Sequence, residues 1–132
     1  MDQIDLSRAT KLKEVAFELE THYTAAVAAT LDRITPKHQD FKQISLYFPC
    51  LFLSRDFRLV DFRTSVGEEI YSQWVDLDRI LVRLWESHAI RMKVICNVRE
   101  KGPKVTHDDM KYLFCGMATK ERIELELIYK DY

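Results

Sequence analysis

Apolar and polar residues alternate along four segments of the chain. In residues 43–48, for example, Ile44 and Leu46 alternate with Ser45 and Tyr47. Successive side chains of a β-strand point to opposite faces of the sheet, so each segment is predicted to be a strand with one buried face. The predicted strands are residues 12–19, 43–48, 91–98 and 123–129.

Between the predicted strands, apolar residues recur at steps of three and four, which is the period of an amphipathic helix. Helices are predicted over residues 23–34, from about residue 64 to 87, and from Thr106 onward. Thr106 and Asp109 resemble a capping box in which aspartate replaces glutamate. The segment 49–62 is apolar but aperiodic, and it stays unassigned. The predicted order is therefore β-α-β-α-β-α-β.

The same alternation predicts how the layers are arranged. Strands joined by helices are usually parallel, and strands covered on both faces form nearly continuous apolar runs. Here glutamates such as Glu14 and Glu126 occupy one face, and burying them without partners would cost several kcal/mol each. We therefore predict an α/β fold with helices on one face of a mostly parallel four-stranded sheet, in a single domain over residues 1–132. A short leucine-rich-repeat-like solenoid and an open-faced sandwich of mixed strands both fit, and a weak repeat of the strand motifs favours the solenoid.

Composition limits the possible functions. The 132 residues suit one domain, and 20 basic against 21 acidic residues give a net charge of −1. A nucleic-acid-binding domain would normally show a basic excess, and the sequence has no polybasic membrane anchor. It has neither a signal peptide nor an apolar run long enough to span a bilayer. Three cysteines without a Cys-x-x-Cys motif indicate reduced thiols, so we expect an intracellular protein, cytoplasmic or nuclear.

Several stretches are similar to a known family. They are residues 34–38 (ITPKH), 43–46 (QISL), 73–82 (QWVDLDRILV), 85–87 (WES) and 90–91 (IR). They resemble the C-terminal region of uncharacterised fungal proteins, some of them F-box-like proteins with leucine-rich-repeat-like tails. The similarity extends from about Ala9 onward and is greatest over Gln73–Arg91. It implies an interaction module that recognises targets for ubiquitination. We find no F-box-like segment, and the resemblance assigns no functional residue.

Histidines and cysteines are the first candidates for catalysis. The chain has four histidines, His22, His38, His88 and His107. They lack metal-binding spacing, and structural or solvent roles are expected for them. A Cys–His nucleophile would combine Cys115 with His107, or use Cys96. Cys96 is predicted on the apolar face of its strand and Cys115 in a helix of buried type, where a thiol is inert. No catalytic residue, metal site or cofactor is therefore predicted.

Carboxylates occur in neighbouring pairs, at positions 68–69, 76 and 78, and 108–109. Neighbours on a helix point in different directions, so these pairs are not expected to converge for acid–base chemistry. Asp76 and Asp78 are instead expected to pair with Arg79 and Arg83 on the solvated side of the long helix. These residues are therefore interpreted as a charged surface.

The open face of the predicted sheet is the strongest candidate for a functional site. Its apolar and aromatic centre lies within a charged rim, as in protein-binding patches. The predicted binding residues are Glu14, Tyr47, Lys93, Ile95, Asn97, Glu124, Glu126 and Ile128. Lys93 is expected to pair with a glutamate of the last strand. We therefore predict a non-enzymatic interaction module with a protein partner, and with neither a nucleic-acid nor a membrane partner.

Three alternatives stay open. The face could be a solvated sheet surface without a partner. The chain could be a small enzyme that uses Cys115 or a histidine. It could also self-associate through an exposed edge strand, for which the strongly β-prone segment 123–129 is the best candidate.

Overall fold

Four parallel strands form the sheet, and they follow one another in chain order. The computed structural model describes residues 11–19, 24–48, 59–99, 105–120 and 122–130. The strands are β1 (Glu14–Glu18), β2 (Gln43–Phe48), β3 (Arg91–Arg99) and β4 (Ile123–Lys130), and their order in the sheet is β1-β2-β3-β4. Each neighbouring pair is parallel. All four predicted strands are confirmed, with bounds that differ by no more than two residues.

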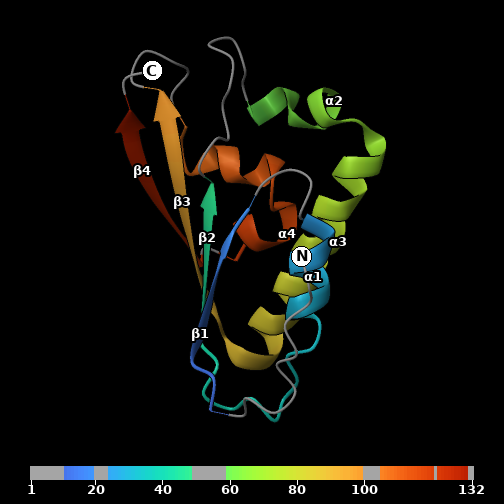
Figure 1. The fold of residues 1–132 in the computed structure, drawn as a ribbon, viewed down its shortest axis with the longest axis vertical. Helices are drawn as coiled ribbons and strands as arrows, with labels where there is room; N and C mark the ends of the chain where they lie inside the picture. The colour runs from blue at the N-terminus through green and yellow to red at the C-terminus, as the bar shows by residue number, and fades with distance from the viewer. Residues whose placement is uncertain (1–10, 20–23, 49–58, 100–104, 121, 131–132) are drawn as a thin grey trace.

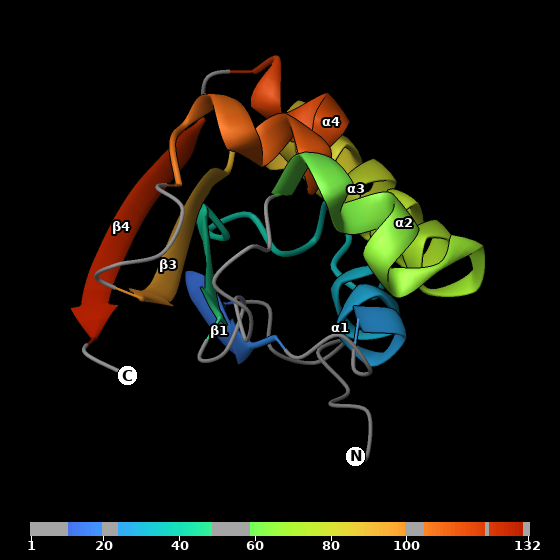
Figure 2. The same cartoon turned by 90° about the horizontal axis from the view of Figure 1, so that it is seen from above.

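The described helices lie on one side of this sheet, as Figures 1 and 2 show. They are α1 (Thr24–Leu31), α2 (Phe62–Val66), α3 (Glu68–His88) and α4 (Cys115–Ala118), with the 3-10 helices η2 (Leu59–Asp61) and η3 (Asp108–Tyr112). The predicted α/β fold, with a four-stranded parallel sheet and helices on one face, is confirmed. The unassigned segment 49–62 ends in η2 and the start of α2, and its residues 49–58 lie outside the described part of the chain.

One apolar core fills the space between the sheet and the helices. Alternate residues of the two central strands are buried, and α3 contributes a stripe at helical spacing to the same core. These residues are Ile44, Leu46 and Phe48 of β2, Met92, Val94 and Cys96 of β3, and Trp74, Leu77, Leu81 and Leu84 of α3. The Trp74 ring stacks on Phe48 at 5.8 Å between centroids. It also contacts Phe62 and Phe114 at 5.1 and 5.7 Å, so this aromatic cluster joins β2, α2, α3 and the segment before α4.

The long helix predicted over residues 64–87 is two helices in the structure. Gly67 separates α2 from α3 with a φ of 86°, a conformation that residues with a side chain rarely adopt. The Arg63 guanidinium donates to the Glu68 carboxylate across the break at 2.8 Å. The apolar stripe continues through Val66 and Ile70 on the two sides of Gly67, so hydrophobic periodicity alone did not reveal the break.

The third predicted helix is also divided. The Thr106 N–H donates to the Asp109 carboxylate at 2.8 Å, which confirms one of the two hydrogen bonds of the predicted capping box. The 3-10 helix η3 follows, and the chain then leaves helical geometry at Phe114 (φ −134°, ψ 67°) before α4 begins. Phe114 is buried against Trp74, and this packing competes with continuation of the helix.

Asp78 holds the short helix α4 against α3. Its carboxylate accepts the backbone N–H groups of Gly116 and Met117 at 2.7 and 3.0 Å. Asp76 contacts Arg79 at 3.5 Å as predicted, but the arginine pairing predicted for Asp78 is wrong. The first N–H groups of a helix have no partner within the helix, so they compete successfully for a nearby carboxylate.

Polar contacts from the end of α3 hold the connection between α1 and β2. Arg83 donates to the carbonyl oxygens of Ile34 and Asp32, each at 3.3 Å. The buried His88 donates through Nε2 to the Thr35 carbonyl at 3.1 Å. These contacts confirm the structural role expected for His88, and they fix the chain where it approaches β2.

The end of α3 offers a test of the backbone geometry. Ala89 caps this helix in the left-handed region (φ 51°, ψ 46°), which costs a residue with a Cβ about 1 kcal/mol. Glycine has no such cost, so we expect Ala89→Gly to raise the free energy of unfolding by about 0.5 kcal/mol in urea denaturation. Ala29→Gly inside α1 should lower it by about 0.5–1 kcal/mol. Equal losses in both variants would contradict this account of the helix end.

A second test concerns the attachment of α4. We expect Asp78→Ala to lower the free energy of unfolding by about 1–3 kcal/mol, because two N–H groups lose a charged acceptor. Asp76→Ala is the matched control, since its exposed pair with Arg79 contributes about 0.5 kcal/mol or less. Urea denaturation of both variants measures the difference, and similar losses would show that the Asp78 contacts contribute nothing.

Candidate functional site

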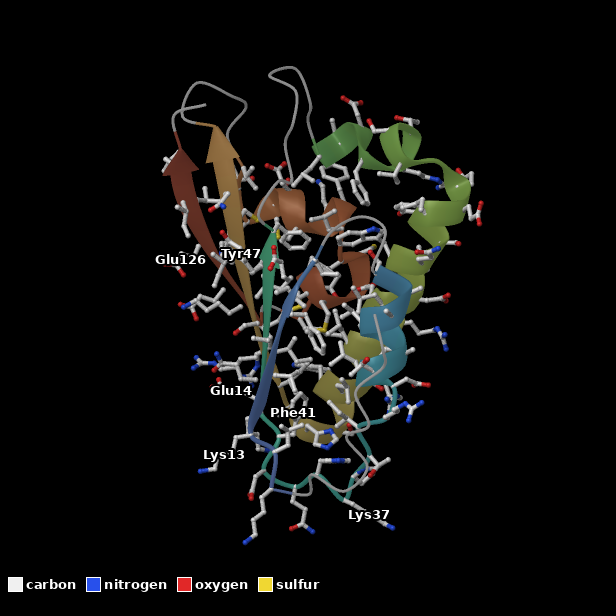
Figure 3. The ribbon with its side chains drawn as sticks, in the orientation of Figure 1. Lys13, Glu14, Lys37, Phe41, Tyr47 and Glu126 are labelled. Carbon is white, nitrogen blue, oxygen red and sulfur yellow. The ribbon has the colours of Figure 1, made fainter. Side chains whose placement is uncertain are left out.

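The eight predicted binding residues lie on the face of the sheet that points away from the helices, and we call this surface the open face. Because the strands follow in chain order, residues far apart in the sequence become neighbours. The neighbouring positions are Tyr47–Ile95–Glu126, Lys93–Glu124 and Asn97–Ile128. Figure 3 shows Glu14, Tyr47 and Glu126 on this side of the sheet. The alternation of side chains between the two faces of each strand was therefore sufficient to predict which residues gather on the open face.

The centre of the open face is a tyrosine held by an asparagine. Asn97 Nδ2 donates to Tyr47 Oη at 2.7 Å, a contact between β3 and β2. Asn97 is 6% exposed, whereas the sequence predicted an exposed contact residue. Its amide group is used by the phenol of Tyr47, so Asn97 positions Tyr47 and offers little surface of its own. Ile95 lies beside Tyr47, and both side chains are half-buried.

Charged residues flank this centre. Lys93 Nζ lies 3.3 Å from Glu126 Oε2, which confirms the predicted cross-strand pair, although the direct neighbour of Lys93 is Glu124. Both members are partly exposed, so the pair contributes about 0–1 kcal/mol. Glu14 and Glu124 are exposed, and Ile128 is 37% exposed. The open face therefore combines an apolar centre with acidic sides.

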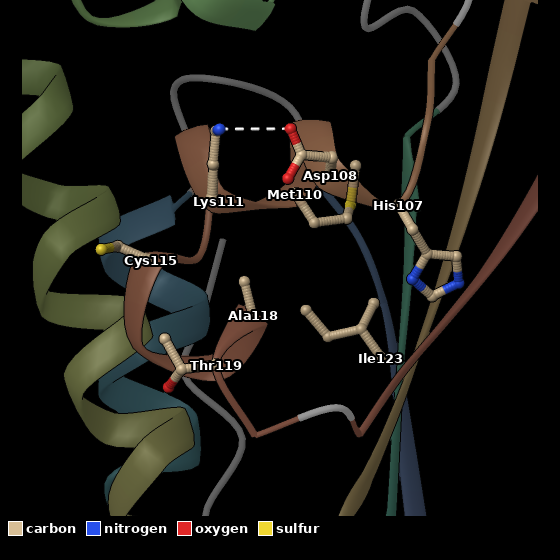
Figure 4. A pocket seen from close by; sticks show the side chains of 8 residues that line it. All are labelled: His107, Asp108, Met110, Lys111, Cys115, Ala118, Thr119 and Ile123. Carbon is tan, nitrogen blue, oxygen red and sulfur yellow. Dashed lines mark ion pairs between the residues drawn. The ribbon is translucent and has the colours of Figure 1, made fainter.

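A hollow of about 610 Å³ lies between η3, α4 and the start of β4, and no sequence pattern predicted it (Figure 4). Its lining residues are His107, Asp108, Met110, Lys111, Cys115, Ala118, Thr119 and Ile123. A second hollow of about 430 Å³ shares His107 and Ile123 and is otherwise lined by Arg91, Arg122 and Glu124. The larger hollow depends on how η3 and α4 are placed relative to β4, which local sequence does not specify.

In the part of the chain that the structure describes, Cys115 and His107 are not arranged as a nucleophile and its base. Figure 4 shows Cys115 and His107 at opposite ends of the hollow, with the sulfur pointing away from the imidazole. Cys115 is exposed and not buried as predicted, because α4 has only four residues and turns its first residue outward. Cys96 is buried as predicted, and burial raises the pKa of its thiol to about 12. His38 is buried in the turn after α1, and His22 lies outside the described residues.

The two described cysteines should therefore differ in reactivity. In a Cys50→Ser background, we expect a maleimide near neutral pH to label Cys115 and to spare Cys96, whose thiol is buried and protonated. The Cys96 thiol should stay protonated up to about pH 11, because its pKa is about 12. Mass spectrometry with and without urea measures the labelling. Adding Cys115→Ser should leave the native protein unlabelled, and native labelling of Cys96 would contradict its burial.

Further features bear on the class of protein. Within the described ranges, no three His, Cys, Asp or Glu side chains group closely enough to hold a metal ion. None of the helices in these ranges has both the length and the hydropathy that crossing a membrane requires. No family model matches the chain, and no match was found among curated proteins or solved structures. The open face and the hollow beside β4 are thus the features from which a function can be argued.

Proposed function

We propose that this chain is a non-enzymatic interaction module that binds a partner protein through its open face. The observation that supports this most directly is the one-sided cover of the sheet (Figure 2). All described helices lie on the opposite face, while Tyr47, Ile95 and Ile128 lie on the face that these helices leave uncovered. A sheet face that meets only water is normally lined by polar residues, so apolar and aromatic side chains there favour a binding role.

The way Tyr47 is held also supports binding. Its hydroxyl accepts the 2.7 Å hydrogen bond from Asn97, which fixes the ring before any partner arrives. Less side-chain entropy is then lost when a complex forms. Tyrosine is also enriched among the residues that dominate the binding energy of protein interfaces. Ile95 beside it supplies additional apolar surface.

The charges of the open face indicate the chemistry of the partner. Glu14 and Glu18 lie along one side of this face, and Glu124 and Glu126 lie along the other, all of them exposed. Lys93 is already paired with Glu126. A partner that places lysine or arginine beside an apolar side chain complements this surface. Its binding should weaken as salt screens these charges.

The resemblance of residues 73–91 to fungal F-box-like proteins suggests what kind of partner the module binds. Leucine-rich repeats and other solenoids present extended binding surfaces built from stacked units. Strands in chain order with helices on one face are compatible with such a build. On this basis we propose a leucine-rich-repeat-like module that acts inside the cell by recognising a target protein.

A double variant, Tyr47→Ser with Ile95→Ser, tests the binding role of the open face. Both side chains are half-buried and Tyr47 accepts the Asn97 hydrogen bond, so the free energy of unfolding should fall by about 1–3 kcal/mol while the fold is retained. Affinity capture from a cell extract should lose the protein that the wild type retains, because the apolar centre of the face is gone.

The matched control removes two exposed apolar side chains from the helix side, Val60→Ser with Val75→Ser. This variant should retain the captured protein. Capture that is unchanged in both variants, or lost in both, would contradict binding through the open face. Collapse of folding in the Tyr47→Ser, Ile95→Ser variant would show that the face is buried.

A further inference from the structure

The strand β4 is at the edge of the sheet, and its inward face is incompletely covered. Leu125 and Leu127 are half-buried, whereas their β3 neighbours Val94 and Cys96 are fully buried. Tyr129 continues the same row and is 57% exposed. The helix layer therefore stops short of β4 and leaves an apolar row that begins at the hollow of Figure 4.

The two edges of the sheet differ in how well they are protected. The strand β1 has five residues, and its open-face positions carry Glu14 and Glu18. Short length discourages pairing with a further strand. Charge does not distinguish the two edges, because β4 carries Glu124 and Glu126 at its own open-face positions. The strand β4 has eight residues, with neither proline nor glycine among them. The β4 edge is therefore the one suited to pair with another strand.

The backbone of β4 is oriented for such pairing. The Met92 N–H of β3 donates to the carbonyl oxygen of Arg122 at 2.9 Å. In a parallel ladder, alternate residues direct both backbone groups to the same neighbouring strand. The even-numbered positions of β4 therefore face β3. Leu125, Leu127 and Tyr129 direct their N–H and C=O groups to the edge at which no described strand pairs with β4.

Antiparallel pairing of β4 with a second copy is most complementary in one register. A two-fold axis perpendicular to the sheet keeps each side chain on its own face of the sheet. Residues that face each other must then lie on the same face, so the axis passes beside one residue of β4 and not between two. With the axis at Leu127, the facing pairs are Leu127–Leu127, Leu125–Tyr129, Glu126–Ile128 and Glu124–Lys130. On the inner face of the sheet apolar residues then meet apolar residues, and on the open face no two glutamates face each other. With the axis at Leu125 or Glu126, glutamate faces glutamate, which is destabilising. With the axis at Ile128, Leu127 faces Tyr129 but Leu125 faces no residue of β4, so fewer apolar residues are paired.

We propose that two copies of this chain join edge to edge through antiparallel pairing of β4, with the two-fold axis at Leu127. Tyr129 of the second copy then lies beside Leu125 and within reach of Ile123, its diagonal neighbour across the junction. Ile123 lines the hollow of about 610 Å³. The exposed aromatic ring of one copy thus covers the apolar side of the hollow in the other.

This pairing leaves the open face accessible. The axis is perpendicular to the sheet, so both helix layers lie on one side of the joined sheet and both open faces lie on the other. Each copy uses its β4 edge once, so the assembly closes as a dimer. The inference is independent of the proposed binding function, because the variants that test the two lie on different surfaces.

Sedimentation velocity over a wide range of protein concentrations tests the dimer. The wild type should show a reversible monomer–dimer equilibrium. Tyr129→Lys should weaken dimerisation at least about tenfold, because each dimer contains the Tyr129 contact twice. Val75→Lys is the matched control, since it places the same charge at a comparably exposed apolar position of α3 (50%). It should dimerise like the wild type.

Three results would overturn the proposal: a wild type that stays monomeric at every concentration, equal weakening in Tyr129→Lys and Val75→Lys, or assembly that grows beyond the dimer. Circular dichroism of Tyr129→Lys establishes that its fold is intact, as the exposure of Tyr129 predicts.

Cross-linking tests the register even if Tyr129→Lys fails to fold. In a Cys50→Ser, Cys115→Ser background, Leu127→Cys places two thiols at facing positions with Cα atoms about 5.5 Å apart, within the range of a disulfide. Glu124→Cys places the two thiols six residues out of register, about 20 Å apart along the strands. Mild oxidation should therefore give a covalent dimer for Leu127→Cys alone, with the Cys50→Ser, Cys115→Ser chain as reference. Equal cross-linking of both variants, or none in either, would contradict the register.

Discussion

Packing of α3 on the two central strands is the contact on which the rest of the structure depends. Trp74, at the sheet-facing side of this helix, stacks on Phe48 of β2, and the leucines that follow at helical spacing are fully buried in the same core. Burying an apolar side chain of this size contributes about 1.5–3 kcal/mol. The stripe of α3 therefore determines which sheet face is the inner one, and so which residues form the open face.

The helices cover the strands unequally because the connections between the strands differ in length. The connection from β2 to β3 carries the 21-residue helix α3, whereas the described part of the connection from β3 to β4 carries η3 with five residues and α4 with four. A short connection spans less of the sheet, so the central strands are sealed while Leu125 and Leu127 of β4 are only half-buried. The hollow lies at the same place, between the short elements and the start of β4.

The sequence predicted which strand residues lie on which face of the sheet, but it predicted few of the features that depend on tertiary contacts. Alternation placed Tyr47 and Ile95 on the open face, because a period of two maps directly onto the two faces of a sheet. The break at Gly67 and the turn at Phe114 were missed, since the apolar stripe hides the first and burial against Trp74 drives the second. The role of Asp78 was mistaken, because its partners lie 38 and 39 residues away on a helix of unpredicted position.

The ion pair between Lys93 and Glu126 links the two surfaces. A charge on an edge strand normally opposes pairing with a second strand. Lys93 belongs to β3, and its ammonium lies 3.3 Å from the Glu126 carboxylate, so this contact compensates the charge from the side away from the free edge. In the proposed dimer Glu126 faces Ile128, an environment that a carboxylate tolerates better when its charge is already compensated. The pair that forms part of the acidic side of the open face thus also makes the β4 edge compatible with a second copy.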